Sequence, residues 1–371
     1  MAKLDSIKFL DFEKELVKNG SEYTAAFSRV LNSGWYILGS EVESFEKEFA
    51  KYLGAKYCIG VGNGLEALQI SLMSLGVGQE DEVITTPISA VATTLAILAV
   101  GATPVFVDTD KNGLIDASLI EKAITKKTKA ILPVHLYGQS VDLNTILKIC
   151  KKYGIYLIED ACQAHGSTSL TTSGSIKNLG TFGIFGCFSF YPTKNLGAFG
   201  DGGAIVTDNP KLAQVCREIR DYGQKSKYVH SRMGLNSRLD ELHAALLRIK
   251  LAHLNSENHS RVNLAKKYIK NLTGKVEIVT TDFKHGNFHQ FVIRVKKRDL
   301  LQKKLQAAGI PTLIHYPITI PDQPFLKNKF NSIAIPEARK FVRETLSLPI
   351  HPLLSLKQID YITSKINSYS G

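Results

Sequence analysis

The 371-residue sequence is short of cysteine, and the few cysteines present are not grouped. No pair forms a C-x-x-C motif, and the five residues stand far apart (Cys58, Cys150, Cys162, Cys187 and Cys216). This spacing favours neither a zinc site nor a disulfide framework, and it is typical of a protein from a reducing compartment. Internal repeats and low-complexity tracts are missing as well. We therefore expect an ordinary globular protein without a metal site.

Long runs of like charge are also absent. The formal net charge is +12, which raises the question of nucleic-acid binding. The lysines and arginines are scattered over helix-like segments such as 121–130 and 300–309, whereas nucleic-acid arms carry five or more like charges in a row. We therefore expect no nucleic-acid partner, and we interpret the positive surplus as attraction for a small polyanionic substrate.

The sequence also lacks a signal peptide and a membrane span. Its first sixteen residues, MAKLDSIKFLDFEKEL, carry charges throughout and contain no apolar core. The most hydrophobic stretch, 89–107, contains three threonines and a Gly-Ala-Thr-Pro break, which predicts a helix, a turn and a strand. We expect a cytoplasmic location and no membrane partner.

From about residue 55 onward, short apolar runs alternate with amphipathic segments. The predicted strands are 55–61, 81–86, 104–107, 130–135, 155–160, 187–191 and 203–208. The predicted helices between them are 65–76, 89–100, 117–124 and 143–154. Such alternation is typical of an α/β protein with a mostly parallel sheet and helices on both faces.

The pattern changes after about residue 240. A long lysine-rich helical segment, 238–272, leads into shorter elements and Pro-rich turns such as HYPITIPDQP (315–324). We therefore predict a large α/β domain over 20–245 and a smaller α+β domain over 250–371, joined by residues 1–19.

The turn between the first predicted strand and helix is rich in glycine and reads GVGNGLEAL over 60–68. Its backbone N–H groups could bind a phosphate with the help of the helix dipole. A Rossmann dinucleotide site is the competing interpretation. That site needs an acidic residue at the end of the next strand, and here that strand ends in TTP. A phosphate-binding turn is therefore favoured.

Two further segments carry candidate chemical groups. The strand 155–160 ends in Glu159 and Asp160, which must point to opposite faces, at the strand end where α/β proteins bind ligands. The alternative is a carboxylate that caps the next helix. In FSFYPTKNLGAFGDGG (188–203), Lys194 follows an apolar strand and the turn at Pro192. Shielding there predicts a lowered pKa, as a Schiff-base lysine requires, and the alternative is a solvated turn. Ser189 alternates with two phenylalanines and could donate to a phosphate.

A phosphate-binding turn, a carboxylate at a strand end and a protected lysine are the three parts that a pyridoxal phosphate enzyme needs. The chain resembles, over nearly its full length, the DegT/DnrJ/EryC1 family of nucleotide-sugar aminotransferases, which have the fold of aspartate aminotransferase (PLP-dependent transferase fold type I). The motifs that carry the resemblance are NGLEAL, EDACQAHG, FSFYPTKNLGAFGDGG and GLNSRLDELHAALL, together with the lesser GATPVFVDTD and PVHLYGQ.

The resemblance implies roles for particular residues. Lys194 is the lysine that holds the cofactor aldehyde, Asp160 pairs with the pyridine nitrogen, and Gln163 approaches the ring hydroxyl. Phosphate ligands matching the family are Asn63, Gly64, Leu65 and Ser189. Asn236 matches a residue that reaches the phosphate from the neighbouring subunit, which implies a homodimer with shared active sites. One departure is Val91, which stands where many members place an aromatic ring on the cofactor.

Within the family, the segments 32–46 and 220–241 look most like the branch that aminates C3 of dTDP-linked 3-keto-6-deoxyhexoses. That branch serves O-antigen (lipopolysaccharide), S-layer and antibiotic sugars, and the family usually takes the amino group from L-glutamate. The candidate substrate residues are Tyr36, His165, Tyr191, Tyr228, His230, Arg238, His315 and Tyr316.

Three alternatives stay open. The first is amination at C4 of a dTDP-, UDP- or GDP-linked 4-keto-6-deoxy sugar. The second is a PLP-dependent sugar dehydratase, a relative of this family in which histidine replaces the lysine. The third is a non-catalytic regulator. Lys194 argues against the second, and the presence of the lysine together with Asp160 and the phosphate ligands argues against the third.

Overall fold

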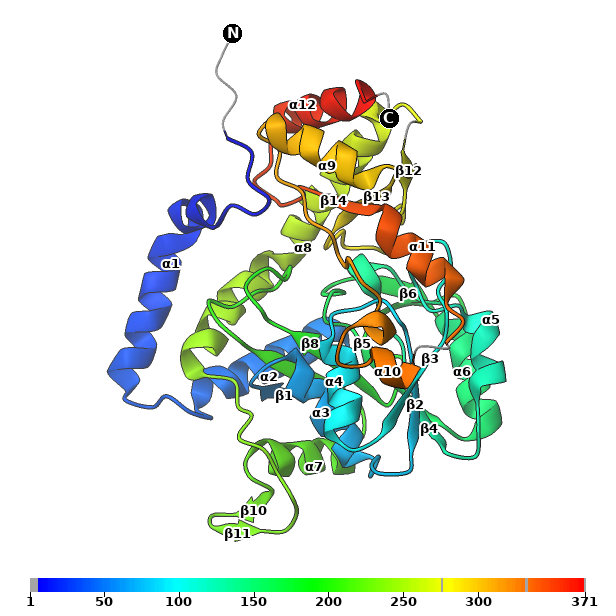
Figure 1. Cartoon of the computed structure of the whole chain (residues 1–371). Helices are drawn as coiled ribbons and strands as arrows, with labels where there is room; N and C mark the ends of the chain where they lie inside the picture. The colour runs from blue at the N-terminus through cyan, green and yellow to red at the C-terminus, as the bar shows by residue number, and fades with distance from the viewer. Residues whose placement is uncertain (1–5, 275, 331–332, 370–371) are drawn as a thin grey trace.

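The computed structural model describes residues 6–274, 276–330 and 333–369 (Figure 1). Its centre is a seven-stranded sheet with the order β1-β9-β8-β5-β4-β2-β3. The strands are β1 (Tyr57–Val61), β2 (Glu82–Thr85), β3 (Thr103–Phe106), β4 (Thr128–Leu132), β5 (Tyr156–Asp160), β8 (Phe185–Ser189) and β9 (Gly203–Thr207). Only β9 among them runs antiparallel to its two neighbours, so the predicted mostly parallel sheet is confirmed.

Helices cover both faces of this sheet. They are α2 (Ser40–Leu53), α3 (Gly64–Ser74), α4 (Ala92–Ala99), α5 (Ala117–Ile120), α6 (Leu143–Tyr153), α7 (Pro210–Arg220) and α8 (Glu241–Asn271), whereas α1 (Phe12–Ser33) packs along α8. Successive strand residues belong to different hydrophobic clusters: Ile84 packs with α2, α6 and α8, whereas Val83 packs with α3, α4 and α7. This alternation is what a sheet buried on both faces requires.

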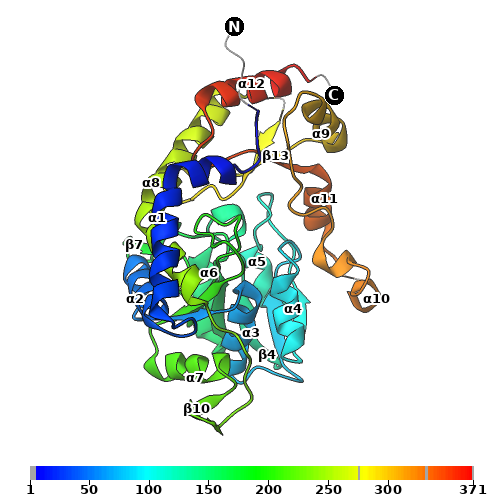
Figure 2. The same ribbon diagram turned by 90° about the vertical axis from the view of Figure 1, so that its left-hand side faces the viewer.

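A second, smaller sheet lies at the other end of α8 (Figures 1 and 2). Its strands β12 (Glu277–Ile278), β13 (Phe291–Arg294) and β14 (Thr345–Leu348) are antiparallel. The remaining elements of this part are η3 (Ile320–Asp322) and the helices α9 (Arg298–Ala307), α10 (Lys327–Phe330), α11 (Pro336–Glu344) and α12 (Leu356–Asn367). Ile7 joins the same hydrophobic cluster as β13, α9 and α12.

The predicted boundary between a domain 20–245 and a domain 250–371 stays a prediction. Helix α8 runs without interruption from Glu241 to Asn271 and carries residues of both hydrophobic clusters, so no linker marks the boundary. The outermost parts of the predicted small domain, 1–5 and 370–371, lie outside the described residues.

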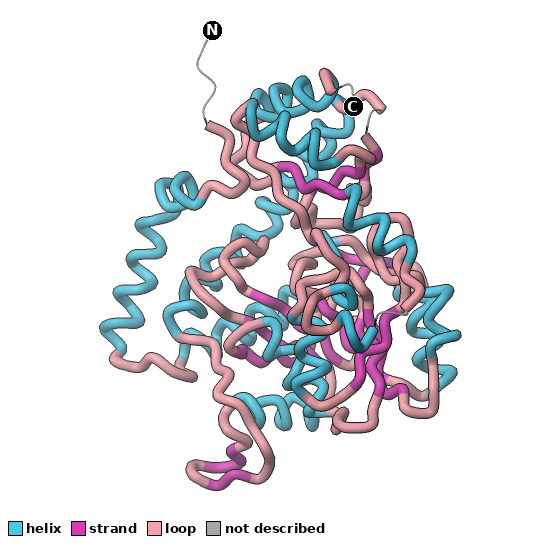
Figure 3. Tube along the Cα trace, in the orientation of Figure 1, coloured by secondary structure: helices cyan, strands magenta, loops and turns pink. Residues whose placement is uncertain are grey.

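Two segments stand away from the body of the molecule. Helix α1 packs along α8 through a small cluster that contains Ala26, Val30 and Ala245. The segment 221–240 projects beyond α7 and is mostly loop, with the short hairpin β10 (Gln224–Ser226) and β11 (Val229–His230) at its end (Figures 1 and 3). A second short hairpin pairs β6 (Thr168–Leu170) with β7 (Ile176–Asn178). Across the described ranges, no helix combines the length and the apolar character that a membrane crossing needs.

Candidate active site

A cavity of about 420 Å³ opens where β5 and β8 end, between the large sheet and the smaller one. The β1–α3 turn contributes Asn63, Gly64 and Leu65, and the ends of β5 and β8 contribute Asp160, Gln163, Ser189, Tyr191 and Lys194. The C-terminal part closes it with His289, Gln290, His315 and Tyr316. Its volume is typical of a small-molecule site. Of the eight residues predicted to bind the cofactor or to take part in the reaction, seven line this cavity. The eighth, Asn236, does not.

Asp160 lies on the cavity wall in a fixed orientation. Its Oδ2 accepts a hydrogen bond from Thr93 Oγ1 (2.8 Å), and its Oδ1 accepts one from the Cys162 amide (3.2 Å). Because the Thr93 hydroxyl donates to Asp160, it must accept from Ser89, whose Oγ lies 2.8 Å away. Asp160 is 4% exposed, and Lys194 is the only lysine or arginine among the described residues that line the cavity.

Glu159 points to the opposite face, as the alternation of β5 predicts. It is fully buried, and its carboxylate accepts hydrogen bonds from the amides of Gly180 (2.8 Å), Phe182 (2.6 Å) and Gly183 (2.7 Å). His135 Nε2 lies 3.0 Å from the same carboxylate. Glu159 therefore fixes the 180–183 loop and is not available to a ligand.

Lys194 ends a tight turn that begins at Tyr191, whose carbonyl accepts a hydrogen bond from the Lys194 amide (2.8 Å). Pro192 occupies the second position of this turn, which suits its fixed φ. Burial lowers the pKa of the Lys194 ammonium, and the nearby Cys162 thiol and Asp160 carboxylate oppose that effect. The direction agrees with the lowered pKa expected from the sequence, and it favours the neutral amine that a nucleophile requires.

The β1–α3 turn offers unused hydrogen-bond donors to the cavity. Asn63 caps α3 by accepting from the Glu66 amide (2.9 Å), whereas the amides of Gly64 and Leu65 donate to no other group within the described ranges. Ser189 lies opposite: a Cβ built on Gly64 would come within 2.7 Å of Ser189 Cβ. The absence of a side chain at Gly64 leaves a space between these groups. Two free helix amides and a hydroxyl surround it, and this arrangement fits a phosphate group.

Gln163 is held between two elements. Its Oε1 accepts from the Tyr137 amide (2.7 Å), and its Nε2 donates to Tyr316 Oη (3.3 Å). Tyr316 in turn follows His315, whose Nδ1 lies 2.9 Å from Ser347 Oγ. Burial, together with the charge of Lys194, lowers the pKa of His315 to about 4. The C-terminal wall of the cavity therefore presents neutral groups near pH 7.

Besides His165, five predicted residues lie outside this cavity. Tyr36, Tyr228, His230 and Asn236 are exposed, and Arg238 is partly buried. Arg238 Nη1 forms an ion pair with Asp221 (3.0 Å), and Asn236 bridges to Asp221 through the backbone. All except Tyr36 belong to the projecting segment 221–240, and none of the five lines the cavity.

His165 was expected among the substrate residues, and the structure places it behind the cavity instead. Its ring packs against Phe188 and Phe190, is completely buried, and makes no hydrogen bond through either nitrogen to the described residues. Burial and the charge of Lys194 lower its pKa to about 3. His165 therefore supports the strand that carries Ser189 and does not face a substrate.

Val91 does not face the cavity either. Its side chain is 37% exposed, and its neighbours Ala90 and Ala92 form the wall at this point. Any ring bound here contacts small aliphatic side chains on this side.

Several cavity residues were not predicted from the sequence, notably Ser89, Thr93, His289 and Gln290. The two hydroxyls stand on a segment predicted to be a helix from residue 89, but α4 begins only at Ala92. His289 and Gln290 precede β13 and carry no recognisable motif. A polar pair directly before a buried strand was the only available signal.

The residues present fit pyridoxal phosphate. Free amides and the Ser189 hydroxyl suit its phosphate, Asp160 suits its pyridine nitrogen, and Lys194 suits its aldehyde. Among the described residues, no group of three or more histidine, cysteine or acidic side chains is arranged to hold a metal ion, and all five cysteines are free.

Comparisons with known proteins agree with this geometry. The model of the DegT/DnrJ/EryC1/StrS aminotransferase family matches residues 17–367. The dTDP-3-amino-3,4,6-trideoxy-α-D-glucose transaminase of Streptomyces venezuelae is 43% identical over 362 residues, which is 96% of this chain and 94% of the relative. The dTDP-3-amino-3,6-dideoxy-α-D-galactopyranose transaminase of Aneurinibacillus thermoaerophilus is 44% identical over 366 residues, 98% and 99% of the two chains. The crystal structure of S. venezuelae DesV with a ketimine intermediate is similar at a TM-score of 0.94 and 42% identity, covering 98% of each chain.

Proposed function

The chain belongs to the DegT/DnrJ/EryC1/StrS aminotransferase family, and we propose that it moves an amino group from L-glutamate to C3 of a dTDP-linked 3-keto-6-deoxyhexose. It is a sugar aminotransferase, and its cofactor is pyridoxal phosphate. The observation that carries the proposal is the convergence of Lys194, Asp160 and the free amides of the β1–α3 turn on one cavity. The choice of C3 is supported by the names of two relatives, which both describe dTDP-linked 3-amino sugars.

The protein groups divide the work of holding the cofactor. The amides of Gly64 and Leu65 and the hydroxyl of Ser189 hold the phosphate, and Asp160 keeps the proton on the pyridine nitrogen. When bound, the cofactor supplies an electron sink for the carbanion that forms during amino transfer. Gln163 is placed beside the ring hydroxyl by its bonds to Tyr137 and Tyr316.

Lys194 carries the proton transfers. With the cofactor and a substrate bound, its Nζ would take the proton from the substrate carbon as a general base and return it as a general acid. The lowered pKa of Lys194 keeps a fraction of the amine neutral near pH 7, which a general base requires. Glutamate and the keto-sugar use the same groups in turn, so the reaction is ping-pong.

The charge of the cavity supports a homodimer. Among the described residues, Lys194 is the only lysine or arginine that lines it, yet glutamate carries two carboxylates and the nucleotide sugar a diphosphate. Lys225, Lys227, Arg232 and Arg238 stand on the segment 221–240, which projects from the body. We infer that this segment, with Asn236, completes the active site of a second copy, and we place the enzyme in the cytoplasm.

The Lys194→Ala variant tests the lysine assignment. Wild-type protein loaded with pyridoxal phosphate is expected to show a visible absorbance band that glutamate bleaches, and the variant is expected to show no steady-state transamination. The exposed Lys211→Ala variant should behave as wild type. Retained turnover in Lys194→Ala would contradict the assignment of Lys194 as the catalytic lysine.

The position of amination needs a separate experiment. A panel of dTDP- and UDP-linked 3-keto and 4-keto sugars, with the product position fixed by NMR, tests C3 against C4.

Shared active sites can be tested by mixing two inactive variants. Lys194→Ala and Asn236→Ala subunits, refolded together in equal amounts, should recover about a quarter of wild-type activity, because half of random dimers are mixed and each mixed dimer has one intact site. If Asn236 acts within its own chain, the mixture stays as inactive as its components.

A further inference from the structure

His289 lies at the junction between the catalytic lysine turn and the C-terminal part of the molecule. Its Nδ1 lies 3.1 Å from Oδ1 of Asn195, the residue directly after Lys194. Asn195 Nδ2 donates to Asn258 Oδ1 (2.8 Å) and to the backbone carbonyl of Asn287 (3.2 Å). A backbone carbonyl can only accept, so this end of Asn195 must be its NH₂ group.

The protonation of the imidazole follows from that orientation. With the NH₂ group of Asn195 committed to Asn258 and Asn287, the atom that faces His289 is an oxygen, and His289 Nδ1 must carry the hydrogen. Burial and the charge of Lys194 lower the pKa of His289 well below its ordinary value. The ring is therefore neutral near pH 7, and its Nε2 bears a free lone pair.

The ring is also fixed in position. The His289 amide donates to Asn287 Oδ1 (2.9 Å), and Asn287 Nδ2 donates to the carbonyls of Gln163 (3.0 Å) and His165 (3.1 Å). Asn287 fits only because residue 138 is glycine, since a Cβ there would come within 1.8 Å of Asn287 Oδ1. A network of buried amides thus orients His289 before any ligand arrives.

His289 lines the active-site cavity together with Lys194, and its Nε2 has no hydrogen-bond partner among the described residues. The neighbouring Gln290, also on the cavity wall, has a buried Oε1 without a partner. Lysine and arginine are absent from the residues of the C-terminal part that line this wall. Free acceptors without a cation suit a ligand that brings hydrogen-bond donors and not carboxylates.

We propose that His289 Nε2 accepts a hydrogen bond from a hydroxyl group of the bound sugar on a carbon next to the one that is aminated. The inference rests on the proposed function and extends it to a residue that recognises one hydroxyl of the sugar. Because the acceptor is fixed and shielded, a substrate without that hydroxyl leaves it unpaired, and such sites discriminate strongly.

Two variants separate the acceptor from the positioning role. His289→Asn keeps an amide donor near the Nδ1 position for Asn195 and removes the Nε2 acceptor, whereas His289→Gln keeps an amide near the Nε2 position and gives up the bond to Asn195. The His289→Asn holoenzyme should still bleach with glutamate, and it should lose about tenfold in kcat/KM for the dTDP-linked 3-keto-6-deoxyhexose.

Substrate analogues provide the decisive comparison. One of the two analogues, 4-deoxy or 2-deoxy, should lower the kcat/KM of wild type about tenfold. The same analogue should not lower the kcat/KM of His289→Asn any further. The dissociation constant of the amino-sugar product, measured by calorimetry on the pyridoxamine form, should show the same coupling. If the effect of the variant and the effect of the missing hydroxyl are additive in free energy for both analogues, the proposal is wrong.

A measurement on wild type needs no variant to fold. Selective ¹⁵N labelling of histidine should show a protonated Nδ1 and an unprotonated Nε2 at position 289, with the Nε2 resonance moving when the amino-sugar product binds. A protonated Nε2 in the free enzyme would also overturn the proposal. Should wild type itself fail to aminate any 3-keto sugar after glutamate has bleached it, the proposed function fails first, and the inference falls with it.

Discussion

The reaction that we propose depends on Asp160 and Lys194, and the orientation of Asp160 depends on a residue from another element. Thr93, in the first turn of α4, donates to Asp160 Oδ2 at 2.8 Å, and both groups are buried. A hydrogen bond to a carboxylate contributes about 1.5–3 kcal/mol, more than a bond between neutral groups. Thr93 is therefore a positioning residue for the carboxylate that faces the pyridine nitrogen.

We predict that Thr93→Val lowers kcat by about tenfold, because the carboxylate loses its buried donor while the shape of the side chain is kept. The pH dependence of the cofactor absorbance should shift as well, whereas Thr93→Ser should restore both. The adjacent Thr94→Val provides a matched control, since the Thr94 hydroxyl is buried without a partner. Equal effects of the two valine variants would show that the hydroxyl of Thr93 has no special part.

The residue scale also shows what the sequence could and could not predict. Lys194, Asp160 and the 63–65 turn stand at the ends of strands whose apolar patterns are local, so the sequence places them at one sheet edge. Thr93 and His289 join them through contacts between segments distant in the chain, and nothing in their own neighbourhood predicts this. Threonine and histidine side chains also often have a purely structural role in other proteins, so the residue type alone does not indicate a site.

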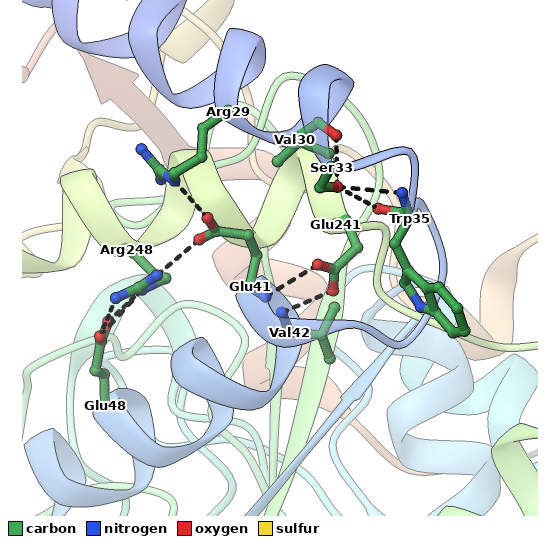
Figure 4. Close-up of polar contacts among 9 residues, drawn as sticks. All are labelled: Arg29, Val30, Ser33, Trp35, Glu41, Val42, Glu48, Glu241 and Arg248. Carbon is green, nitrogen blue, oxygen red and sulfur yellow. Dashed lines mark hydrogen bonds and ion pairs between the residues drawn. The ribbon is translucent and has the colours of Figure 1, made fainter.

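At the scale of elements, the start of α8 fixes the start of α2 (Figure 4). Glu241 is 2% exposed, and its carboxylate accepts from the amides of Gly39, Glu41 and Val42, each at 2.9 Å. These amides belong to the N-terminal turn of α2, whose own N-cap residue is glycine without a side chain to offer. Glu241 therefore replaces the missing cap from a helix that lies about two hundred residues away in the chain.

A second carboxylate ties the same elements together (Figure 4). Glu41 pairs with Arg29 of α1 (2.6 Å) and with Arg248 of α8 (2.7 Å), and Arg248 also pairs with Glu48 (2.7 Å). The loop between α1 and α2, which carries the exposed Tyr36, is thus held at both ends.

We predict that Glu241→Gln destabilises the protein by about 1–3 kcal/mol, because the amide offers one acceptor oxygen in place of two and leaves a buried donor facing backbone N–H groups. Urea unfolding at fixed protein concentration measures the change. Glu48→Gln is the control: Glu48 is 41% exposed and its ion pair is expected to contribute less than about 1 kcal/mol. Similar losses for both variants would contradict a capping role.

Predicted and observed elements differ where distant segments interfere. The helix predicted over 89–100 begins only at Ala92, and just before this segment the Pro87 carbonyl accepts a hydrogen bond from the distant Ile320 amide (2.8 Å). Strand β9 runs antiparallel to β8 because the connection over 190–202 carries the lysine turn and no crossover helix. The missing helical pattern there was a usable signal for strand direction.

At the scale of the whole molecule, the local alternation of strands and helices was enough to predict the α/β class. It was not enough to predict how the two parts join, because the single helix α8 contributes to the hydrophobic clusters of both parts. The cavity depends on that junction, since His289, His315 and Tyr316 come from the C-terminal part. The site therefore forms only when the whole chain is folded.

Buried histidines around that junction make the stability of the whole molecule depend on pH. Burial lowers the pKa of His165 to about 3 and of His315 and His351 to about 4, from an ordinary value of 6.5. His289 is shifted in the same direction. As the pH falls below 6.5, the unfolded chain takes up protons at these positions and the folded protein does not. The free energy of unfolding must therefore decrease as the pH falls.

We predict that each of these histidines removes up to about 1.4 kcal/mol of stability for every pH unit from about pH 6.5 down to its folded pKa. Urea unfolding of the cofactor-free protein between about pH 7 and pH 5 measures the slope. His165→Leu should make the slope shallower, because the ring that resists protonation in the folded protein is removed. The exposed His259→Asn should leave the slope unchanged. A slope that His165→Leu does not alter would mean that this ring is already protonated, or already solvated, in the folded molecule.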